Sequence, residues 1–585
     1  MAFTKLGQPT TPSISTSSKR RFIILFLLFI IFFPLLFLSS AFFPNPQHLD
    51  DVVHLQTHPT FFNPNKIKPP RWLKVIHETH LWPHETLKIG LVNFEDQEES
   101  HLKLGGTAES VIINFESVVS SNITWEDLFP EWVDETKPRG SCPEIPMPEP
   151  GKYSGLDVVV AQLPCKEVEE EIDIHGNVRK AGMRDVDRLQ ISLATARLVV
   201  ENGISQENKD VYAVFIAKCE PMMELFRCDD LVWHKGDYWV YKPNVEKLKE
   251  MIRMPVGSCA LAHPYVGNSG SRQLQANTNE LPHELQLLTR SPSTYTRKEA
   301  YVTVLHSSED YVCGAIALAQ SILQTNTTKD LILLADHTIS YHSILGLQAA
   351  GWKIKRIDRI KSPSAKIDAY NKWNYSKLRI WQLTEYDKLM FIDSDFIVLH
   401  NIDHFFEFPQ LSAAPNDNWL FNSGIMLLEP SECFFDNLMS KRYTLKSYNG
   451  GDQGYLNEVL TWWHRLTLKI NFLKFFDKEG GDRLVPEDRY TVHFLGTKPW
   501  LCYRDYDCNW DRQDYHLFAS DDAHARWWQV YDAMPNKLQK YCGMTRRQDR
   551  GVRNRKANAQ KADLSDGHWK IELKDPRQYD LMESL

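Results

Sequence analysis

The stretch Lys388-Leu-Met-Phe-Ile-Asp393-Ser-Asp395-Phe-Ile-Val-Leu399 decides the fold of this chain. Its apolar run 389–392 predicts a buried strand of a parallel sheet, and two carboxylates follow directly. Alternate side chains of an extended chain share a face, so Asp393 and Asp395 lie close together. Such a pair is typical of a site for a divalent cation that carries a diphosphate. A turn that closes the strand is the alternative for a bare Asp-x-Asp.

The residues before this pair alternate between strands and helices. Strands are predicted at 301–305, 331–334 and 352–357, with helices between them at 311–324 and 340–350. This order predicts a right-handed, mainly parallel α/β layer. Ligands of such sheets bind at the carboxyl ends of the strands, where the aspartates fall.

A second α/β region is predicted upstream of this layer. Its strands are predicted at 87–92, 110–114, 156–160 and 211–217, with a helix at 185–201. No catalytic constellation is recognisable in it. A polar Ser/Asn/Gln-rich connector at 267–298 predicts the main boundary. The predicted parts are therefore an N-terminal α/β region at 81–266, a catalytic domain at 299–545 and a C-terminal extension at 546–585.

The N-terminus has the features of a membrane anchor. Residues 22–43 are almost wholly apolar and follow Lys19, Arg20 and Arg21. A run of about 20 apolar residues spans a bilayer, and the basic flank keeps residues 1–21 in the cytosol. The alternative is a cleaved signal peptide. We expect a single-pass type II protein with a stem at 44–80 and a lumenal body.

Charge and cysteine content narrow the function classes. The formal charge is -8 and no long basic face is present, which argues against nucleic acid as a partner. All ten cysteines follow the apolar run, so several should pair in an oxidising lumen. Cys219 with Cys228, or Cys502 with Cys508, would close short loops. No Cys-x-x-Cys is present, so a structural zinc is not expected.

Four polar clusters accompany the aspartates. They are Tyr375-Ser-Lys377-Leu-Arg379-Ile-Trp381, Phe421-Asn-Ser-Gly-Ile-Met, Asn449-Gly-Gly-Asp-Gln-Gly-Tyr and His493-Phe-Leu-Gly-Thr-Lys-Pro-Trp500. In this order they resemble glycosyltransferase family 8, the retaining group with the Rossmann-like GT-A fold that includes glycogenin. The resemblance covers roughly 301–500.

Further segments resemble a plant glycogenin-like branch that adds glucuronic acid to xylan in cell-wall synthesis. They are Trp125-Glu-Asp-Leu-Phe-Pro-Glu-Trp132, Leu501-Cys-Tyr-Arg-Asp-Tyr-Asp-Cys508, Asp532-Ala-Met-Pro and Asp566-Gly-His-Trp-Lys570. This resemblance implies a Golgi membrane enzyme with UDP-glucuronate as donor and xylan as acceptor.

The resemblance also implies roles for single residues. Asp393, Asp395 and His493 would hold Mn²⁺, while Gly496 and Lys498 would contact the diphosphate. Leu305, His306 and Ser307 would border the uridine, and Tyr311 would stack on the uracil. The transferred sugar would lie among Lys377, Ser394, Asn422, Ser423, Gly424, Asn449, Asp452 and Gln453. Of these, Lys377, Asp452 and Gln453 would be catalytic, positioning and polarising the donor for a same-face internal return without a covalent residue.

Two departures from glycogenin bear on the reaction. Glycogenins typically carry an aspartate where this chain has Asn449, and an amide removes repulsion toward a sugar carboxylate, with which Lys377 or Arg379 could pair. We hypothesise that Asn449 helps admit glucuronate. The segment after Ile470 lacks the tyrosine that glycogenin glucosylates, so self-priming is not expected.

Other interpretations stay open. The chain could transfer glucose or galactose to another acceptor, or be a non-catalytic subunit that binds polysaccharide or scaffolds a synthase. A homodimer or a synthase complex is a further expectation. The aromatic residues at 500–531 favour a packed core over a polysaccharide subsite, and the basic run 546–556 favours a solvated helix face.

Overall fold

The computed structural model describes residues 70–79, 86–95, 108–136, 142–165, 170–172, 178–180, 184–205, 210–265, 297–417, 419–476 and 483–575. The predicted cytosolic tail, the membrane span and nearly all of the predicted linker lie outside these residues. Within them, no helix combines the length and the apolar character needed to cross a membrane. The described residues belong to one compact unit, Ile67–Leu585.

The first sheet confirms the predicted upstream strands. Its order is β2 (Ala108–Ile113), β1 (Leu87–Val92), β3 (Val158–Gln162), β6 (Tyr212–Ile216), β8 (Tyr238–Tyr241) and β7 (Leu231–Lys235). The first four strands are parallel, and β8 and β7 add an antiparallel hairpin that the sequence analysis missed.

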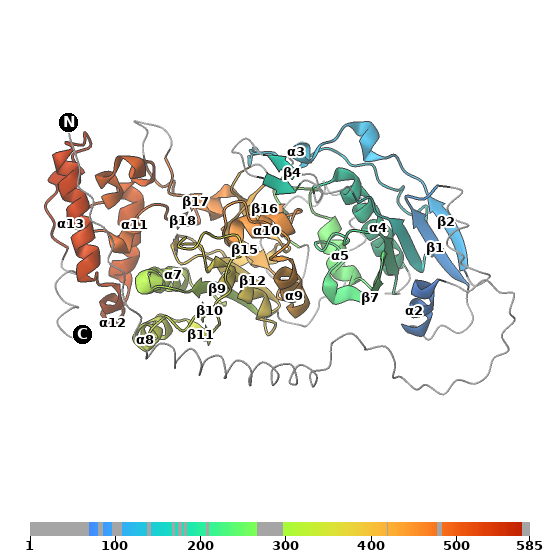
Figure 1. The fold of residues 1–585 in the computed structure, drawn as a ribbon, viewed down its shortest axis with the longest axis horizontal. Helices are drawn as coiled ribbons and strands as arrows, with labels where there is room; N and C mark the ends of the chain where they lie inside the picture. Colours follow the sequence, from blue (N-terminus) through green and yellow to red (C-terminus); the bar gives the residue numbers. More distant parts are fainter. Residues whose placement is uncertain are drawn as a thin grey trace, which may run out of the picture. The chain divides into compact units, whose positions relative to one another are not determined.

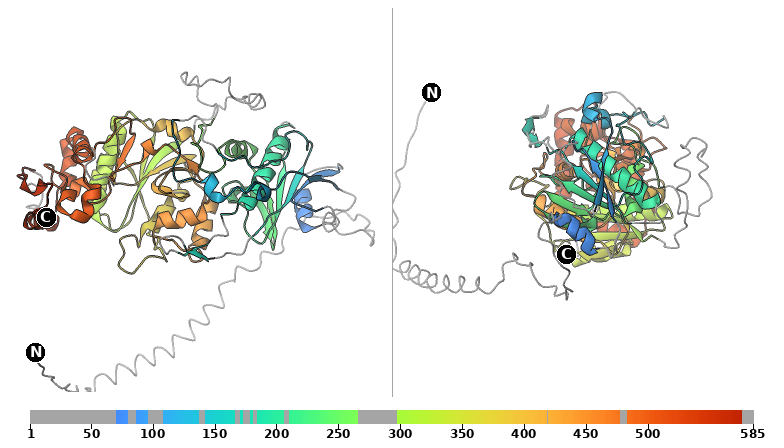
Figure 2. Two further views of the ribbon diagram at one scale, coloured as in Figure 1. Left: turned by 90° about the horizontal axis from the view of Figure 1, so that it is seen from above. Right: turned by 90° about the vertical axis from the view of Figure 1, so that its right-hand side faces the viewer.

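Helices cover both faces of this sheet (Figures 1 and 2). Val158 and Val160 pack in one apolar cluster with Trp72 of α2 (Arg71–Thr79), whereas Val159 belongs to the cluster that includes α4 (Val186–Ser205). This alternation is the two-residue period of a strand buried on both faces. Because α2 lies at 71–79, this part of the predicted stem is folded.

The second sheet carries the aspartate pair. Its order is β11 (Lys353–Arg356), β10 (Asp330–Ala335), β9 (Glu299–Leu305), β12 (Lys388–Ile392), β15 (Phe421–Leu428), β14 (Ser412–Pro415) and β16 (His464–Arg465). The four strands from β11 to β12 are parallel, as predicted. Beyond β12 the sheet is mixed, because β15 runs antiparallel to both β12 and β14. A mixed α/β architecture with parallel sheets is thus confirmed.

The two faces of the second sheet bury different partners. One face packs on α7 (Val312–Gln324), α8 (Tyr341–Ala349) and α11 (Asp521–Ala533). The other face contributes Val302 and Phe391 to an apolar cluster that also contains residues of the N-terminal region, such as Leu189 and Phe226. The two α/β regions therefore share one apolar core.

Polar contacts between the regions concentrate on the segment 429–468. The Arg184 guanidinium donates to the carbonyl of Asn457 at 2.7 Å. The Glu224 carboxylate accepts from the backbone amides of Thr461 at 2.7 Å and Trp462 at 3.1 Å. Arg465 donates to the carbonyl of Ser258 at 2.6 Å. Before the Asn449–Gln453 motif, the Asn437 side chain donates to Glu220 at 2.7 Å, so the N-terminal region holds the chain on both sides of the motif.

All ten cysteines form disulfides. The pairs are Cys142–Cys259, Cys165–Cys219, Cys228–Cys433, Cys313–Cys542 and Cys502–Cys508. The predicted Cys502–Cys508 bridge is confirmed, whereas a Cys219–Cys228 bridge is wrong. Cys165 and Cys219 follow the ends of the neighbouring parallel strands β3 and β6, which brings them together, and Cys228 reaches α9 (Glu432–Lys441) instead.

The C-terminal aromatic residues form core, as predicted. Trp500, Trp527, Trp528, Tyr503 and Tyr506 are all buried. The basic run begins α13 (Arg546–Lys561), whose Arg546, Arg547 and Arg550 are exposed.

His568 gives this C-terminal part a pH-dependent contact. Its ring contacts Asp521 of α11 at 2.8 Å and Asp566 at 3.1 Å, and stacks on Trp510. His516 also faces Asp566, and Tyr506 lies beside the His568 ring. Burial alone would lower the pKa of His568, but the two carboxylates outweigh it and raise that pKa above 6.5.

The stability contribution of protonated His568 is therefore fully present below about pH 6.5 and is lost as the pH rises through the higher folded pKa. We predict that His568→Gln lowers the free energy of unfolding more at about pH 6 than at about pH 9. Urea unfolding at both pH values measures this. Equal losses would show that the protonated form contributes nothing.

Candidate active site

Three predicted cation ligands meet at the end of β12. Asp393 and Asp395 follow this strand, and β13 (Phe396–Val398) then pairs antiparallel with β18 (Thr491–His493), which places His493 opposite Phe396. The Phe494 amide donates to the Asp395 carbonyl at 2.9 Å and closes this pairing. One ligand atom from each of the three side chains lies within 4.8 Å of the others. The predicted triad is thus assembled by strand pairing across about a hundred residues.

The electrostatics of the triad fit a cation. Burial lowers the pKa of His493 to about 4, so its imidazole is neutral and has a lone pair to offer. Burial raises the pKa of Asp393, and the charges of Asp395 and Asp452 act in the same direction against the opposing charge of Lys377. Burial would also raise the pKa of Asp395, but Lys498 and His493 outweigh it and lower that pKa, so Asp395 stays ionised beside an Asp393 whose charge its neighbours do not neutralise. Two carboxylates and an imidazole form a donor set for a divalent ion.

Lys377 joins the triad to the Asn449–Gln453 motif. It lies on the 3₁₀ helix η8 (Asn374–Gln382), and its ammonium is 2.6 Å from Asp452 and 3.3 Å from Asp393. Burial would lower the pKa of Lys377, but these two carboxylates raise it, so the ammonium stays charged. In contrast, Arg379 donates to Gln382 and packs on Phe435, which leaves Lys377 as the candidate partner of a sugar carboxylate.

Asp452 begins α10 (Asp452–Val459), and its neighbours fix its side chain. The Ser423 hydroxyl donates to the Asp452 carboxylate at 2.8 Å. Gln453 accepts from the Ser423 amide at 3.2 Å and donates to the Tyr448 hydroxyl at 3.0 Å. The predicted residues Ser423, Asp452 and Gln453 therefore lie in one hydrogen-bonded group.

Asn422 and Gly424 line the other side of β15. The Asn422 side chain donates to Asn416 at 3.0 Å and accepts from the Gly424 amide at 2.9 Å. A Cβ at Gly424 would lie 2.7 Å from the Asn422 oxygen and 2.9 Å from the His493 ring. Glycine thus makes room for the imidazole. Ser394 is buried between the aspartates, with its carbonyl oxygen against Gly314 of α7.

Asn449 is exposed and caps the start of α10. Its side-chain oxygen accepts from the amides of Gly451 at 2.9 Å and Gly454 at 3.2 Å, and from the Ser447 hydroxyl at 3.0 Å. An aspartate could accept the same hydrogen bonds and would suit the positive end of the helix. The fold therefore tolerates either residue.

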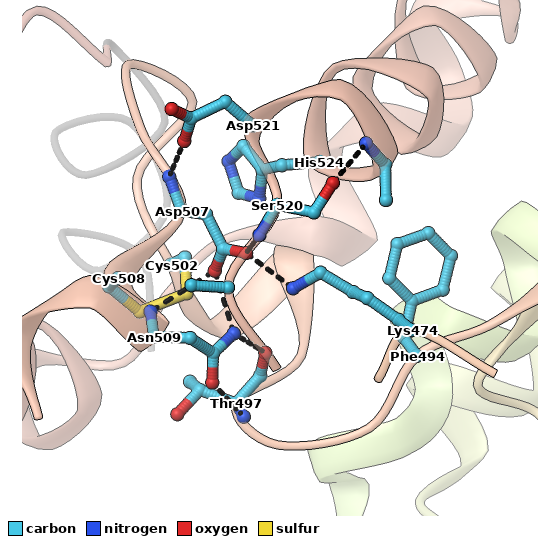
Figure 3. A network of polar contacts seen from close by, with 12 residues as sticks. Lys474, Phe494, Thr497, Cys502, Asp507, Cys508, Asn509, Ser520, Asp521 and His524 are labelled. Carbon is cyan, nitrogen blue, oxygen red and sulfur yellow. Dashed lines mark hydrogen bonds and ion pairs between the residues drawn. A yellow bond between two sulfur atoms is a disulfide. The ribbon is translucent and has the colours of Figure 1, made fainter. Parts of the chain in front are cut away.

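The predicted diphosphate loop is held by Asn509 (Figure 3). The Asn509 side chain accepts from the Thr497 amide at 2.7 Å and donates to the Thr497 carbonyl at 3.0 Å. Gly496 has φ of 73°, and a Cβ there would lie 2.5 Å from the Asn509 oxygen. Next to it, the Lys498 ammonium is 2.8 Å from Asp395. The loop thus presents its lysine to the triad.

The predicted nucleotide residues surround the end of β9. Leu305 is buried, Ser307 has φ of 71°, and the His306 ring contacts the Ser307 hydroxyl at 2.8 Å. The pKa of His306 is lowered by burial, and the charges of Asp452 and Lys377 also act on it. Tyr311 is exposed, and the centroids of its ring and the Trp500 ring are 5.8 Å apart in an edge-to-face arrangement.

Asp336 is a candidate site residue that no sequence motif indicated. It accepts from the Ser307 amide at 3.3 Å, and the Arg359 guanidinium lies 2.9 Å from its carboxylate. It directly follows β10, at the same edge of the sheet as Asp393. The rule that ligands bind at the carboxyl ends of parallel strands was the signal that could have found it.

Known proteins match both regions of the chain. Residues 64–259 match the model of the GUX1-5 N-terminal domain, and residues 302–503 match glycosyl transferase family 8. UDP-glucuronate:xylan alpha-glucuronosyltransferase 2 of Arabidopsis thaliana is 46% identical, over 88% of this chain and 85% of that protein. This chain belongs to glycosyltransferase family 8, in the branch of these plant proteins.

Two further relatives show how this chain is related to other glycosyltransferases of family 8. UDP-glucuronate:xylan alpha-glucuronosyltransferase 1 of Arabidopsis thaliana is 43% identical, over 84% of this chain and 72% of that protein. Mouse glycogenin-1 is 31% identical over 34% of this chain and 65% of its own length. The chain is therefore a glycosyltransferase with glycogenin-like sequence, and the predicted family is confirmed. Family 8 enzymes generally use a divalent metal, and the Asp393, Asp395 and His493 cluster is a possible site for one.

Proposed function

We propose that this family 8 enzyme transfers glucuronic acid from UDP-glucuronate to the xylan backbone with retention of configuration. The relatives named for this reaction support the substrates. The observation that carries the catalytic part is the complete cluster of Asp393, Asp395 and His493 with Lys377 and Lys498 at its edges. A silent scaffold would have no need for three converging ligands and two lysines.

Mn²⁺ is the cation we propose for this cluster. Two hard carboxylates and one imidazole suit a borderline divalent ion better than a purely oxygen-lined cage would. When bound, the ion would stabilise the negative charge that grows on UDP as the sugar leaves. Lys498, which contacts Asp395 in this structure, would supply a second positive charge to the diphosphate.

The chain's own polar groups would position the sugar. In the reaction the bond from C1 of the sugar to the phosphate breaks, a xylan hydroxyl bonds to C1, and its proton leaves with UDP. The Asp452 carboxylate already contacts Lys377 and Ser423, so it is placed to orient rather than to attack. This arrangement supports a same-face return without a covalent intermediate.

The amide of Asn449 gives a prediction about the donor. Asn449→Asp keeps the hydrogen bonds that cap α10, so the protein should fold normally. The added charge would repel the carboxylate of glucuronate and not neutral glucose, so the ratio of kcat/KM for UDP-glucuronate over UDP-glucose should fall about tenfold or more. Steady-state kinetics with both donors measure this ratio. An unchanged ratio would refute the role of Asn449, and Asn449→Gln, which adds no charge, is the control.

We further propose a Golgi lumenal location behind a type II membrane anchor. The apolar run 22–43 supports the anchor, and five disulfides support an oxidising compartment. A homodimer or a synthase complex stays a prediction.

The proposal is tested by offering three donors to the same enzyme. Residues 44–585 are incubated with xylo-oligosaccharide and UDP-glucuronate, UDP-glucose or UDP-galactose, with and without Mn²⁺, and UDP release is followed. The expected result is Mn²⁺-dependent release from UDP-glucuronate above all. Preferred use of UDP-glucose or UDP-galactose would refute the glucuronate assignment, and folded protein that releases no UDP from any donor would favour a non-catalytic scaffold.

A further inference from the structure

Asn471 contacts the back of the His493 ring, away from the aspartates. It directly precedes β17 (Phe472–Leu473), which pairs in parallel with β18, so Leu473 lies opposite His493. The Asn471 side-chain oxygen and the His493 Nδ1 are 3.1 Å apart, and both residues are buried. On the other side of the ring, Nε2 lies 3.5 Å from Asp395. The imidazole therefore bridges Asn471 and the aspartate pair.

This contact determines which nitrogen carries the proton. An amide oxygen only accepts, so a neutral His493 must donate from Nδ1 and keep its lone pair on Nε2, facing Asp395. An amide turned the other way would donate to Nδ1 and force the proton onto Nε2, where it would block a cation. The Asn471 amide nitrogen is buried and has no hydrogen-bond partner among the described residues. In this orientation the buried amide nitrogen costs about 1–3 kcal/mol as a donor without a partner, and the structure nevertheless places the oxygen, not the nitrogen, on Nδ1.

Other groups hold the plane of the ring but not its tautomer. Phe396 stacks on the imidazole at 4.1 Å, and Gly424 leaves space beside its Cε1 atom. Both contacts are apolar and act equally on either tautomer. Among the described residues, the polar contact of Nδ1 is with the Asn471 side chain.

We propose that Asn471 is a positioning residue of the cation site, holding His493 in the tautomer and orientation in which Nε2 binds the cation. This inference rests on the proposed metal-dependent function. A partner of this kind on the far ring nitrogen typically contributes 10–100-fold to metal affinity. No motif of the sequence marks Asn471, because it precedes His493 by 22 residues.

The test is a Mn²⁺ titration of the full-length protein, with bound and free Mn²⁺ distinguished by electron paramagnetic resonance. Asn471→Leu and Asn471→Ala remove the acceptor and should raise the Kd for Mn²⁺ about 10–100-fold. Asn471→Asp keeps an acceptor oxygen in place and should bind Mn²⁺ within about threefold of the wild type, since carboxylate–histidine–metal arrangements are common. Asn202→Leu, a change at a buried asparagine of α4, is the matched control and should leave the Kd unchanged.

The ranking of the variants by their Kd for Mn²⁺ distinguishes a positioning role of Asn471 from a packing role. A merely structural role would make Asn471→Asp the worst variant, because it buries a charge, and Asn471→Leu the mildest. That order, or a wild-type Kd in both acceptor-free variants, would overturn the inference. Failure of the wild type itself to bind Mn²⁺ would instead overturn the proposed metal site, and the inference with it.

Discussion

Asp395→Ala is expected to reduce sugar transfer by at least about a thousandfold, or roughly 4 kcal/mol of transition-state stabilisation. Asp395 offers one of the three cation ligands, and it also contacts Lys498 at 2.8 Å and His493 at 3.5 Å. Its loss therefore removes a ligand and leaves the lysine of the diphosphate loop without its carboxylate. Turnover of UDP-glucuronate with xylo-oligosaccharide, at saturating donor and Mn²⁺, measures the loss.

Two further variants show whether the loss of activity is specific to the Asp395 carboxylate. Asp395→Asn preserves the shape of the side chain but not its charge, so it should also lose most activity. Asp488→Asn is the matched control, because Asp488 is an exposed partner of Lys469 away from the cluster, and it should retain full activity. Near-normal transfer by Asp395→Ala would mean that the cluster does not hold the catalytic cation.

The second large effect is expected on stability. Lys474 and Asp507 form an ion pair in which both side chains are fully buried (Figure 3). The Asp507 carboxylate also accepts from the amide of Ser520 at 2.9 Å and from the side chain of Asn509 at 2.6 Å. Removing one partner of a buried pair leaves an uncompensated charge, which typically costs about 3–5 kcal/mol. We predict that Asp507→Ala lowers the free energy of unfolding by this amount.

Urea unfolding followed by circular dichroism measures this loss. The exposed pair Lys469–Asp488 provides the control, since Lys469→Ala should change the free energy of unfolding by less than about 1 kcal/mol. Lys474→Met in the Asp507→Ala background should cost less than the sum of the single changes, because no charge then remains alone. An Asp507→Ala variant as stable as the control would show that the pair contributes nothing.

These two predictions are linked through Asn509. Asp507 holds Asn509, and Asn509 holds both the amide and the carbonyl of Thr497, between Gly496 and Lys498. The buried pair is therefore the support of the predicted diphosphate loop. A stability defect at Asp507 should be accompanied by weaker binding of UDP.

Local sequence patterns predicted the strands and the aspartate pair well. Residues 389–392 form an unbroken apolar run. Few structures other than a buried strand suit such a run directly before two carboxylates, so β12 and its carboxyl edge could be predicted from the sequence. The positions of Lys377 and His493 came from the family resemblance instead. Their contacts with Asp452 and Asp395 depend on the path of the chain between distant segments.

Features set by long-range packing were not predictable. Cys228 pairs with Cys433 across 205 residues, and nothing near either cysteine identifies its partner. The polar composition of 267–298 indicated a boundary, but it could not indicate that Phe226 and Phe391 share one apolar cluster across it. Asn471 lies outside every motif, because its role depends on the pairing of β17 with β18.

The proposed reaction is tested most directly by the product formed from UDP-glucuronate and a xylo-oligosaccharide in the presence of Mn²⁺, analysed by mass spectrometry and by the anomeric proton signals in NMR. The expected product is an oligosaccharide that has gained one glucuronic acid in α linkage, and the Asp395→Ala variant should form none. A β-linked product would contradict retention. An unchanged oligosaccharide with folded wild-type protein would contradict the proposed reaction.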